Sequence, residues 1–192
     1  MKELLVATHN LHKKEEIQQI LGDRFLVKSL TDVGYHEEIE ENGSSFFENA
    51  LIKAQTCYLA TEIPCIGDDS GLSVDVLDGR PGIYSARYAS DHDFDKNIEK
   101  VLEEMEGKED RKAHFVTVLC YFTKDGPQYF EGKVYGNLIE ENKGHKGFGY
   151  DPIFVPEGYD KTFAEMDPEE KNEISHRRNA FDKFLAELDR KN

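Results

Sequence analysis

The segment that most constrains the fold is the run from Ala113 to Phe122, the longest stretch of apolar, β-branched and aromatic residues in the chain. Such a run predicts a strand in the middle of a sheet. Lys124-Asp125-Gly126 is a turn signal, and residues 128–135 alternate polar and apolar side chains, which predicts the partner strand of a hairpin. The rest of the chain must therefore fold around a β-sheet.

Helix signals lie before and after this hairpin in the sequence. Asn10 predicts the cap of a helix that ends at Gly22, and Ser45 with Glu48 forms a capping box. Further helices are predicted over 95–105 and from residue 167 onward, with a break near Ser175. Shorter strands are predicted at 4–7, at 64–67 with an end at the Asp68-Asp69 pair, at 72–76 and at 153–155. This mixture predicts an α/β fold, with residues 1–192 as a single domain.

The helix opened by Ser45 shows a predicted core stripe along one face. Its members are Phe47, Ala50, Leu51, Ala54, Cys57 and Tyr58. The pattern places Asn49 and Lys53 on a different face, away from that core.

The charge balance excludes several kinds of partner. The chain has 24 Lys and Arg against 39 Asp and Glu, a formal net charge of −15. Duplex nucleic acid and anionic membrane surfaces need a basic face, so neither is expected as a partner. No apolar run is long enough to cross a membrane. The three cysteines show no CxxC spacing and are expected to be reduced, mostly buried thiols, as in a cytoplasmic protein.

The segment Thr8 to Lys14 joins a predicted strand to a predicted helix. Lysines in the first turn of a helix face its partial positive charge, which is unfavourable unless an anion binds there. Free backbone N–H groups, Thr8, Asn10 and Lys13 would then hold a phosphate. The alternative is a solvated basic turn with an ordinary Asn cap, and this segment alone does not decide between the two.

Acidic residues gather at two places. Asp68 and Asp69 follow a predicted strand, at a sheet edge where ligands commonly bind, and Glu37 to Glu41 form an acidic run. Magnesium prefers oxygen ligands, typically one or two carboxylates together with substrate phosphates and waters. For most of the glutamates, a solvated loop is the better interpretation.

Two later segments are candidates for contact with a flat, charged ligand. Glycines surround Phe148 between Gly144 and Asp151, so a planar ligand can approach closely and stack on an aromatic face. The alternative is a tight loop that anchors an aromatic ring in the core. The basic residues between Lys171 and Arg178 can reach phosphates or a base edge, or simply form a solvated helix face.

Taken together, these motifs closely resemble the inosine/xanthosine triphosphate pyrophosphatase family, from the first strand to the last helix. The matching blocks are Thr8-x-Asn10-x-x-Lys13, Ser45-Phe46-x-Glu48-Asn49-Ala50, Lys53-Ala54, Asp68-Asp69-Ser70-Gly71-Leu72, residues 81–88, residues 147–152 and Ser175-His176-Arg177. The resemblance implies an elongated, twisted mixed sheet flanked by helices, with two lobes around a nucleotide-binding cleft. It also implies a cytoplasmic homodimer that hydrolyses non-standard purine nucleoside triphosphates to the monophosphate and pyrophosphate.

Residue roles follow from the resemblance, position by position. It implies Asp69 as proton acceptor and Mg²⁺ ligand, with Glu40 as a second metal ligand, although Glu40 and Glu41 are not distinguished by sequence. The implied substrate-binding residues are Thr8, Asn10, Lys13, Lys53, Ser70, Phe148, Gly149, Tyr150, Asp151, Lys171, His176 and Arg177. Arg177 would donate to the 6-oxygen of hypoxanthine or xanthine and face a like donor in adenine.

Three alternatives stay open. A septum-formation-inhibitor type of nucleotide pyrophosphatase usually has Ser and Arg where this chain has Thr8-His9-Asn10 and Lys13. A nucleotide-binding module without turnover would release no pyrophosphate. A metal-independent nucleic-acid binder is disfavoured by the acidic charge.

Overall fold

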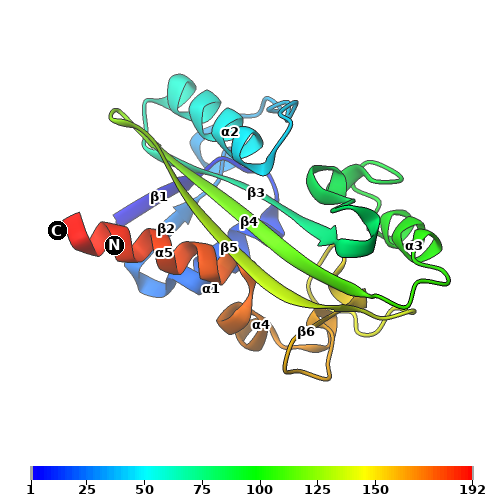
Figure 1. The fold of residues 1–192 in the computed structure, drawn as a ribbon. Coiled ribbons are helices and arrows are strands. Elements are labelled where there is room, and N and C mark those ends of the chain that lie inside the picture. Colours follow the sequence, from blue (N-terminus) through cyan, green and yellow to red (C-terminus); the bar gives the residue numbers. More distant parts are fainter. Residues whose placement is uncertain (1, 192) are drawn as a thin grey trace. The chain divides into compact units, whose positions relative to one another are not determined.

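The computed structural model describes residues 2–191, which fold into helices and strands joined by loops (Figure 1). The α-helices are α1 (Leu11–Leu21), α2 (Phe46–Thr61), α3 (Phe94–Glu104), α4 (Pro168–Ile174) and α5 (His176–Lys191). The strands are β1 (Lys2–Val6), β2 (Phe25–Lys28), β3 (Cys65–Val74), β4 (Lys112–Thr123), β5 (Gly126–Leu138) and β6 (Phe154–Pro156). No helix within these residues is both long and apolar enough to span a membrane.

The strands form one six-stranded sheet in the order β2-β1-β3-β4-β5-β6. β1 pairs in parallel with β2 and with β3, whereas β5 and β6 pair antiparallel, so the sheet is mixed. The predicted mixed α/β class, with a sheet flanked by helices, is confirmed. The described residues divide into two compact units: unit 1 comprises 2–69, 117–132 and 177–191, and unit 2 comprises 70–116 and 133–176.

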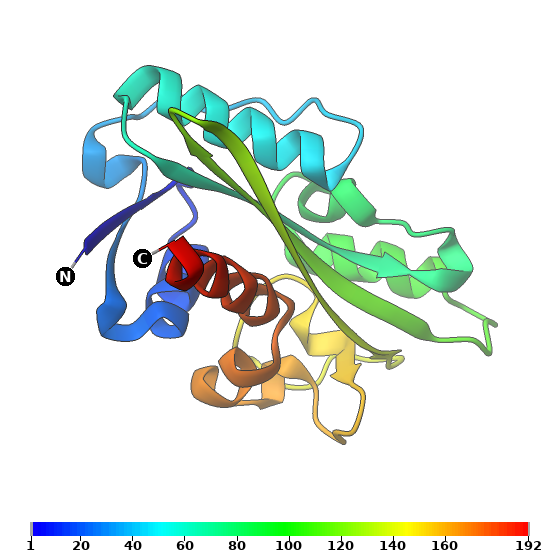
Figure 2. The ribbon, with the colours of Figure 1, turned by 60° about the vertical axis from the view of Figure 1, so that its left-hand side comes forward.

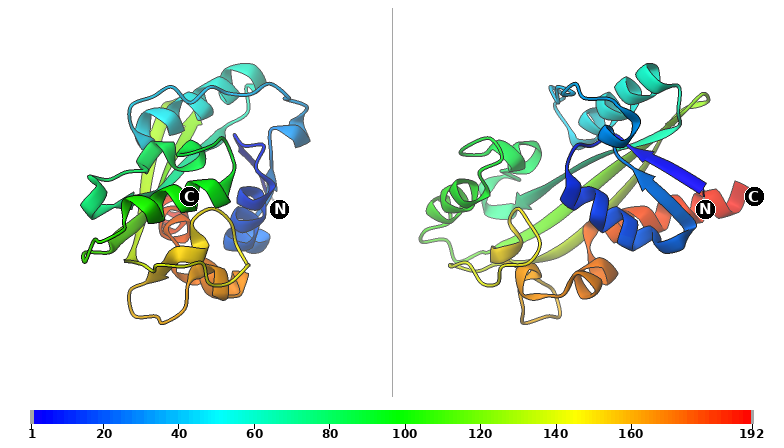
Figure 3. Two further views of the ribbon diagram at one scale, coloured as in Figure 1. Left: turned by 90° about the vertical axis from the view of Figure 1, so that its right-hand side faces the viewer. Right: turned by 180° about the vertical axis from the view of Figure 1, so that it is seen from behind.

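Unit 1 has helices on both faces of its strands. One face carries a core in which Ile17 of α1 and Phe181 of α5 pack with Val6, Ile66 and Leu119 of the strands. The views in Figures 2 and 3 show α5 next to α1, and Arg24 Nη2 lies 2.6 Å from Asp189 Oδ1 beside them. Helix α2 covers the opposite face of these strands (Figure 2).

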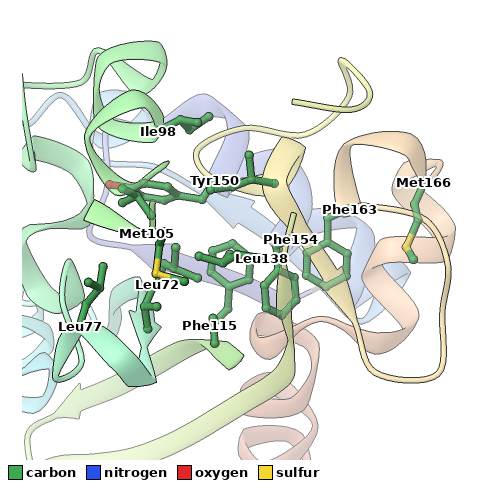
Figure 4. Close-up of a cluster of buried hydrophobic side chains, with 14 residues drawn as sticks. Leu72, Leu77, Ile98, Met105, Phe115, Leu138, Tyr150, Phe154, Phe163 and Met166 are labelled. Atoms are coloured by element: carbon green, nitrogen blue, oxygen red, sulfur yellow. The ribbon is translucent and has the colours of Figure 1, made fainter. Parts of the chain in front are cut away.

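Unit 2 has a separate core that is rich in aromatic rings (Figure 4). Phe115 of β4 packs against Phe154 and Phe163, with ring centroids 4.6 and 5.9 Å away. Tyr150 enters the same core, and its hydroxyl donates a hydrogen bond to the Ser85 carbonyl at 2.6 Å. This core fixes the loop that carries the candidate ligand-binding residues of unit 2.

Local signals in the sequence predicted most element ends correctly. Asn10 Oδ1 accepts from Lys13 N and Ser45 Oγ accepts from Glu48 N, so both predicted N-caps are confirmed. The break between the last two helices falls at Ser175, as predicted. The tight turn after Thr123 also forms, and it joins β4 to β5.

Two predictions about unit 1 are wrong. The strand predicted to end at Asp68 continues as β3 through both aspartates to Val74, because neighbouring cations compensate their buried charge. Phe47 does not lie in the core: it is 43% exposed, with its ring 5.6 Å from the ring of Tyr129. The same helix buries Asn49 and Lys53, which the core stripe had excluded.

Candidate active site

The turn from β1 into α1 carries a cation, the Lys13 ammonium, and is held by side-chain hydrogen bonds. Thr8 Oγ1 accepts a hydrogen bond from Asn10 N at 3.0 Å, and Asn10 Oδ1 accepts one from Lys13 N at 3.2 Å. The Lys13 ammonium lies 3.2 Å from Asp68 Oδ1. Burial lowers the pKa of Lys13, against the opposing effect of the Asp68 carboxylate. The turn therefore holds its lysine toward β3 rather than toward bulk solvent.

Lys53 of α2 is the centre of a buried charge cluster. Its ammonium donates to the Asp68 carbonyl at 2.5 Å and lies 2.6 Å from Glu41 Oε1 and 3.5 Å from Asp69 Oδ1. Burial opposes the charged form, but the Asp69 and Glu41 carboxylates outweigh it and raise the pKa of Lys53. Lys53 thus brings the acidic segment before α2 together with the middle of β3, where the aspartates lie.

Asp68 is compensated by a buried arginine. Arg177 is 1% exposed, and its Nε lies 2.8 Å from Asp68 Oδ2. The same guanidinium pairs with Glu16 of α1. Burial alone would raise the pKa of Asp68, but Arg177 and Lys13 hold it well below its usual range. The Arg177 guanidinium thus pairs with two carboxylates, those of Asp68 and Glu16. That it donates a hydrogen bond to the edge of a purine base stays a prediction.

Asp69 differs from its neighbour because it is poorly compensated. Burial and the adjacent Glu41 carboxylate raise the pKa of Asp69 to about 6, although Lys53 acts in the opposite direction. Its Oδ2 atom is buried and has no hydrogen-bond partner among the described residues. Two neighbouring carboxyls with an unpaired oxygen are the donor set that a divalent cation completes. Asp69 and Glu41 therefore fit a magnesium ion.

The predicted second metal ligand, Glu40, lies differently from Glu41. Glu40 is exposed, whereas Glu41 is half-buried and contacts Lys53. Within residues 2–191 no group of three or more His, Cys, Asp or Glu side chains is arranged to hold a metal ion.

The candidate residues of unit 2 form their own buried cluster. Lys171 Nζ lies 2.7 Å from Asp151 Oδ2, which also accepts a hydrogen bond from Phe148 N at 3.0 Å. The same ammonium lies 5.0 Å from the centroid of the Phe148 ring. Gly147 has a φ of 70°, and a Cβ there would lie 2.1 Å from Asp151 Oδ2. The glycine-rich loop is therefore fixed by one ion pair beneath a half-buried aromatic ring.

The remaining predicted residues of unit 2 are buried or half-buried among other side chains of this unit. Tyr150 belongs to the core, and the ring of His176 stacks on Phe115 at 4.9 Å between centroids. Ser70 follows Asp69 within β3 and is half-buried, and Gly149 is half-buried beside Phe148. Their predicted contacts with a nucleotide stay predictions.

The structure thus brings the predicted residues together in two groups, one in each unit. In unit 1 the group contains Lys13, Lys53, Asp69 and Arg177, with Thr8 and Asn10 at the turn that positions Lys13. In unit 2 it contains Phe148, Asp151 and Lys171. Sequence reasoning missed Glu16 as a member of unit 1's group. Its position three residues after Lys13, on one face of α1, was the available signal.

Comparison with known proteins gives the family directly. A model of the Ham1 family matches residues 4–187. The dITP/XTP pyrophosphatase of Bacillus subtilis is 50% identical over 98% of each chain, and that of Christiangramia forsetii is 45% identical over 96% of this chain and 98% of its own. Solved structures share this fold. The Staphylococcus aureus Ham1 protein has a TM-score of 0.89 and 39% identity over 100% of both chains. The chain belongs to the Ham1 family, which confirms the resemblance found in its motifs.

Proposed function

We propose that this protein hydrolyses non-standard purine nucleoside triphosphates, such as inosine, deoxyinosine and xanthosine triphosphates, to the monophosphate and pyrophosphate. The observation that carries the proposal is the buried cluster of Lys53, Asp69 and Glu41, in a chain 50% identical to a dITP/XTP pyrophosphatase. The substrate would be the free nucleotide rather than nucleic acid, consistent with a net charge of −15.

The cluster supplies the groups that this reaction needs. Lys13, Lys53 and the N-terminus of α1 would hold the triphosphate and draw negative charge from it. Asp69 would accept a proton from a water molecule whose oxygen bonds to the α-phosphorus. The bond from that phosphorus to the bridging oxygen breaks, and pyrophosphate leaves with the electron pair. The raised pKa of Asp69 supports its role as the base, because it indicates a carboxylate with unused affinity for a proton or cation.

Magnesium would be held by Asp69 and one glutamate of the acidic segment, and when bound it neutralises phosphate charge. The 2.6 Å distance between Glu41 Oε1 and Lys53 Nζ supports Glu41 for that second position. Glu40 is the residue that the family resemblance implies.

At the other end of the nucleotide, Phe148 would stack on the purine, while Lys171 and Asp151 would fix the loop around it. Ser70, Gly149, Tyr150 and His176 would add contacts. For Arg177 to donate to the 6-oxygen of the base, its guanidinium must give up part of its bonding to Asp68 or Glu16. We further propose that the enzyme acts in the cytoplasm as a homodimer. Sedimentation of the purified protein would test whether it is a dimer.

The direct test of the chemistry uses inosine triphosphate with Mg²⁺ and measures pyrophosphate release. Asp69→Asn keeps the shape of the side chain and removes the base, so turnover should fall at least 1000-fold. Near-normal turnover of that variant would contradict the proposal.

Glu41→Gln and Glu40→Gln form a matched pair for the metal site. The variant that removes a ligand should raise the Mg²⁺ concentration needed for half-maximal rate at least tenfold, whereas the other should change it less than twofold. Titration of the protein with Mg²⁺ alone, followed by calorimetry, gives the same comparison without turnover. If neither variant changes either quantity, the second metal ligand is not in this acidic segment.

A further inference from the structure

Asn49 of α2 is buried, yet only one of the two polar groups of its side chain has a hydrogen-bond partner among the described residues. It is 1% exposed, and its Oδ1 accepts a hydrogen bond from Gly43 N at 2.9 Å. A backbone N–H can only donate, so this bond fixes which end of the amide is oxygen and which is nitrogen. The Nδ2 group is buried with no hydrogen-bond partner among the described residues. Buried polar groups in native proteins are nearly always paired, so this donor calls for a specific explanation.

The surroundings of Asn49 connect it to the charge cluster of unit 1. Lys53 lies one helical turn later on the same face of α2, and its ammonium pairs with Glu41 at 2.6 Å. Two side chains of α2 therefore hold the segment that precedes this helix: Asn49 binds Gly43, and Lys53 binds Glu41. The β3 backbone passes close to this part of α2, since a Cβ on Gly67 would lie 2.1 Å from the Ala50 carbonyl oxygen.

Among the described residues of unit 1, the buried side-chain atoms without a partner are Asn49 Nδ2 and Asp69 Oδ2. One is a donor and the other an acceptor, and the ammonium of Lys53, one turn of α2 after Asn49, lies 3.5 Å from Asp69 Oδ1. Holding Gly43 uses only the acceptor oxygen of Asn49. The nitrogen is therefore not explained by the contact with the loop.

We propose that Asn49 is a further substrate-binding residue, whose Nδ2 donates a hydrogen bond to an oxygen of the bound polyphosphate while its Oδ1 holds the acidic segment. This inference rests on the proposed function, since it assumes that the cluster of Lys53 and Asp69 binds a polyphosphate. An anionic oxygen is the acceptor that a neutral buried N–H group binds most strongly. The ligand would thus satisfy the donor that the protein leaves unpaired.

Two variants of Asn49 separate its two ends. Asn49→Asp keeps an acceptor for Gly43 N and removes the donor, whereas Asn49→Ala removes both without adding charge. We expect kcat/KM for inosine triphosphate to fall at least tenfold in both variants. The Kd for pyrophosphate in the presence of Mg²⁺, measured by calorimetry, should rise at least tenfold in both. Pyrophosphate is not turned over, so this readout is independent of the chemical step.

Asn97 of α3 is the matched control, because it is equally buried but fully paired. Its Oδ1 accepts from Ala89 N and Ser90 N, and its Nδ2 donates to the Ala86 carbonyl. Asn97→Asp should lower the melting temperature and leave pyrophosphate binding by the folded protein unchanged. Both Asn49 variants should instead weaken pyrophosphate binding by the folded protein, whatever change in melting temperature the buried charge of Asn49→Asp brings.

The outcomes are distinct. If wild-type protein releases no pyrophosphate from inosine triphosphate, the proposed function fails. If the wild type is active and binds pyrophosphate, but either Asn49 variant stays within twofold of it in both readouts, the inference about Asn49 is overturned. If Asn49→Asp matches the wild type in kcat/KM and in the Kd for pyrophosphate while Asn49→Ala does not, the residue serves only to hold Gly43.

Discussion

Arg177→Met should lower the free energy of unfolding by about 3 kcal/mol, because it leaves a buried carboxylate short of its main counter-charge. The Arg177 side chain is 1% exposed and that of Asp68 is 0% exposed, with 2.8 Å between Nε and Oδ2. Removing one partner of such a pair typically costs about 3–5 kcal/mol. The lower end applies here because Lys13 still lies 3.2 Å from Asp68. Methionine retains most of the apolar stem, so the loss mainly reports the charge.

The assay is urea unfolding followed by circular dichroism, with linear extrapolation to water. Coincident transitions by circular dichroism and intrinsic fluorescence would establish that one free energy describes both units. Arg178→Met is the control on the same helix, since Arg178 forms an exposed pair with Asp182 and should lose no more than about 0.5 kcal/mol. If Arg177→Met lowers the free energy of unfolding by less than about 1 kcal/mol, Arg177 is not the main counter-charge of Asp68.

Three further predictions concern single groups. Gly147→Ala should cost about 1–2 kcal/mol of unfolding free energy, because alanine is strained at a φ of 70°. The same variant should raise KM for inosine triphosphate, because the new Cβ would displace Asp151. Lys171→Met should cost about 3 kcal/mol in urea unfolding, since it leaves Asp151 buried without its cation; no loss would contradict the assignment. The hydrogen bond from Lys14 lowers the pKa of Asp32 from 3.8 to about 2, so its stabilisation is present at neutral pH and is lost as the pH falls from about 4 toward 2. Asp32→Ala should therefore cost about 1 kcal/mol or less at pH 7, and unfolding curves should show this gap closing below pH 4.

Features set by nearby residues could be predicted from the sequence. The caps at Asn10 and Ser45 and the break at Ser175 depend on contacts within a few positions, and each is confirmed. The hairpin formed by β4 and β5 follows in the same way from an apolar run and a turn signal.

Features set by distant residues could not be predicted in this way. Asp disfavours strands, so a strand was expected to end at Asp68. It continues because Lys13 and Arg177, which are 55 and 109 positions away, neutralise that carboxylate. Which of Glu40 and Glu41 contacts Lys53 is likewise set by the fold, and no local pattern specifies it.

Periodicity failed on α2 for a related reason. The apolar stripe placed Phe47 inside and Lys53 outside, but helix position alone does not show which faces meet the sheet. Lys53 is buried because carboxylates on β3 and in the acidic segment surround its ammonium. The family motifs nevertheless named both Lys53 and Asp69, which the structure brings within 3.5 Å of each other; their roles stay predictions.

Substrate choice and the bond that is cleaved can be measured together. Inosine, deoxyinosine, xanthosine, guanosine and adenosine triphosphates would each be incubated with the protein and Mg²⁺, and every phosphorus-containing product identified by ³¹P NMR. We expect pyrophosphate and the nucleoside monophosphate from the first three nucleotides, at kcat/KM values at least tenfold above that for ATP. Release of orthophosphate in place of pyrophosphate, or equal rates for ATP and inosine triphosphate, would contradict the proposed function.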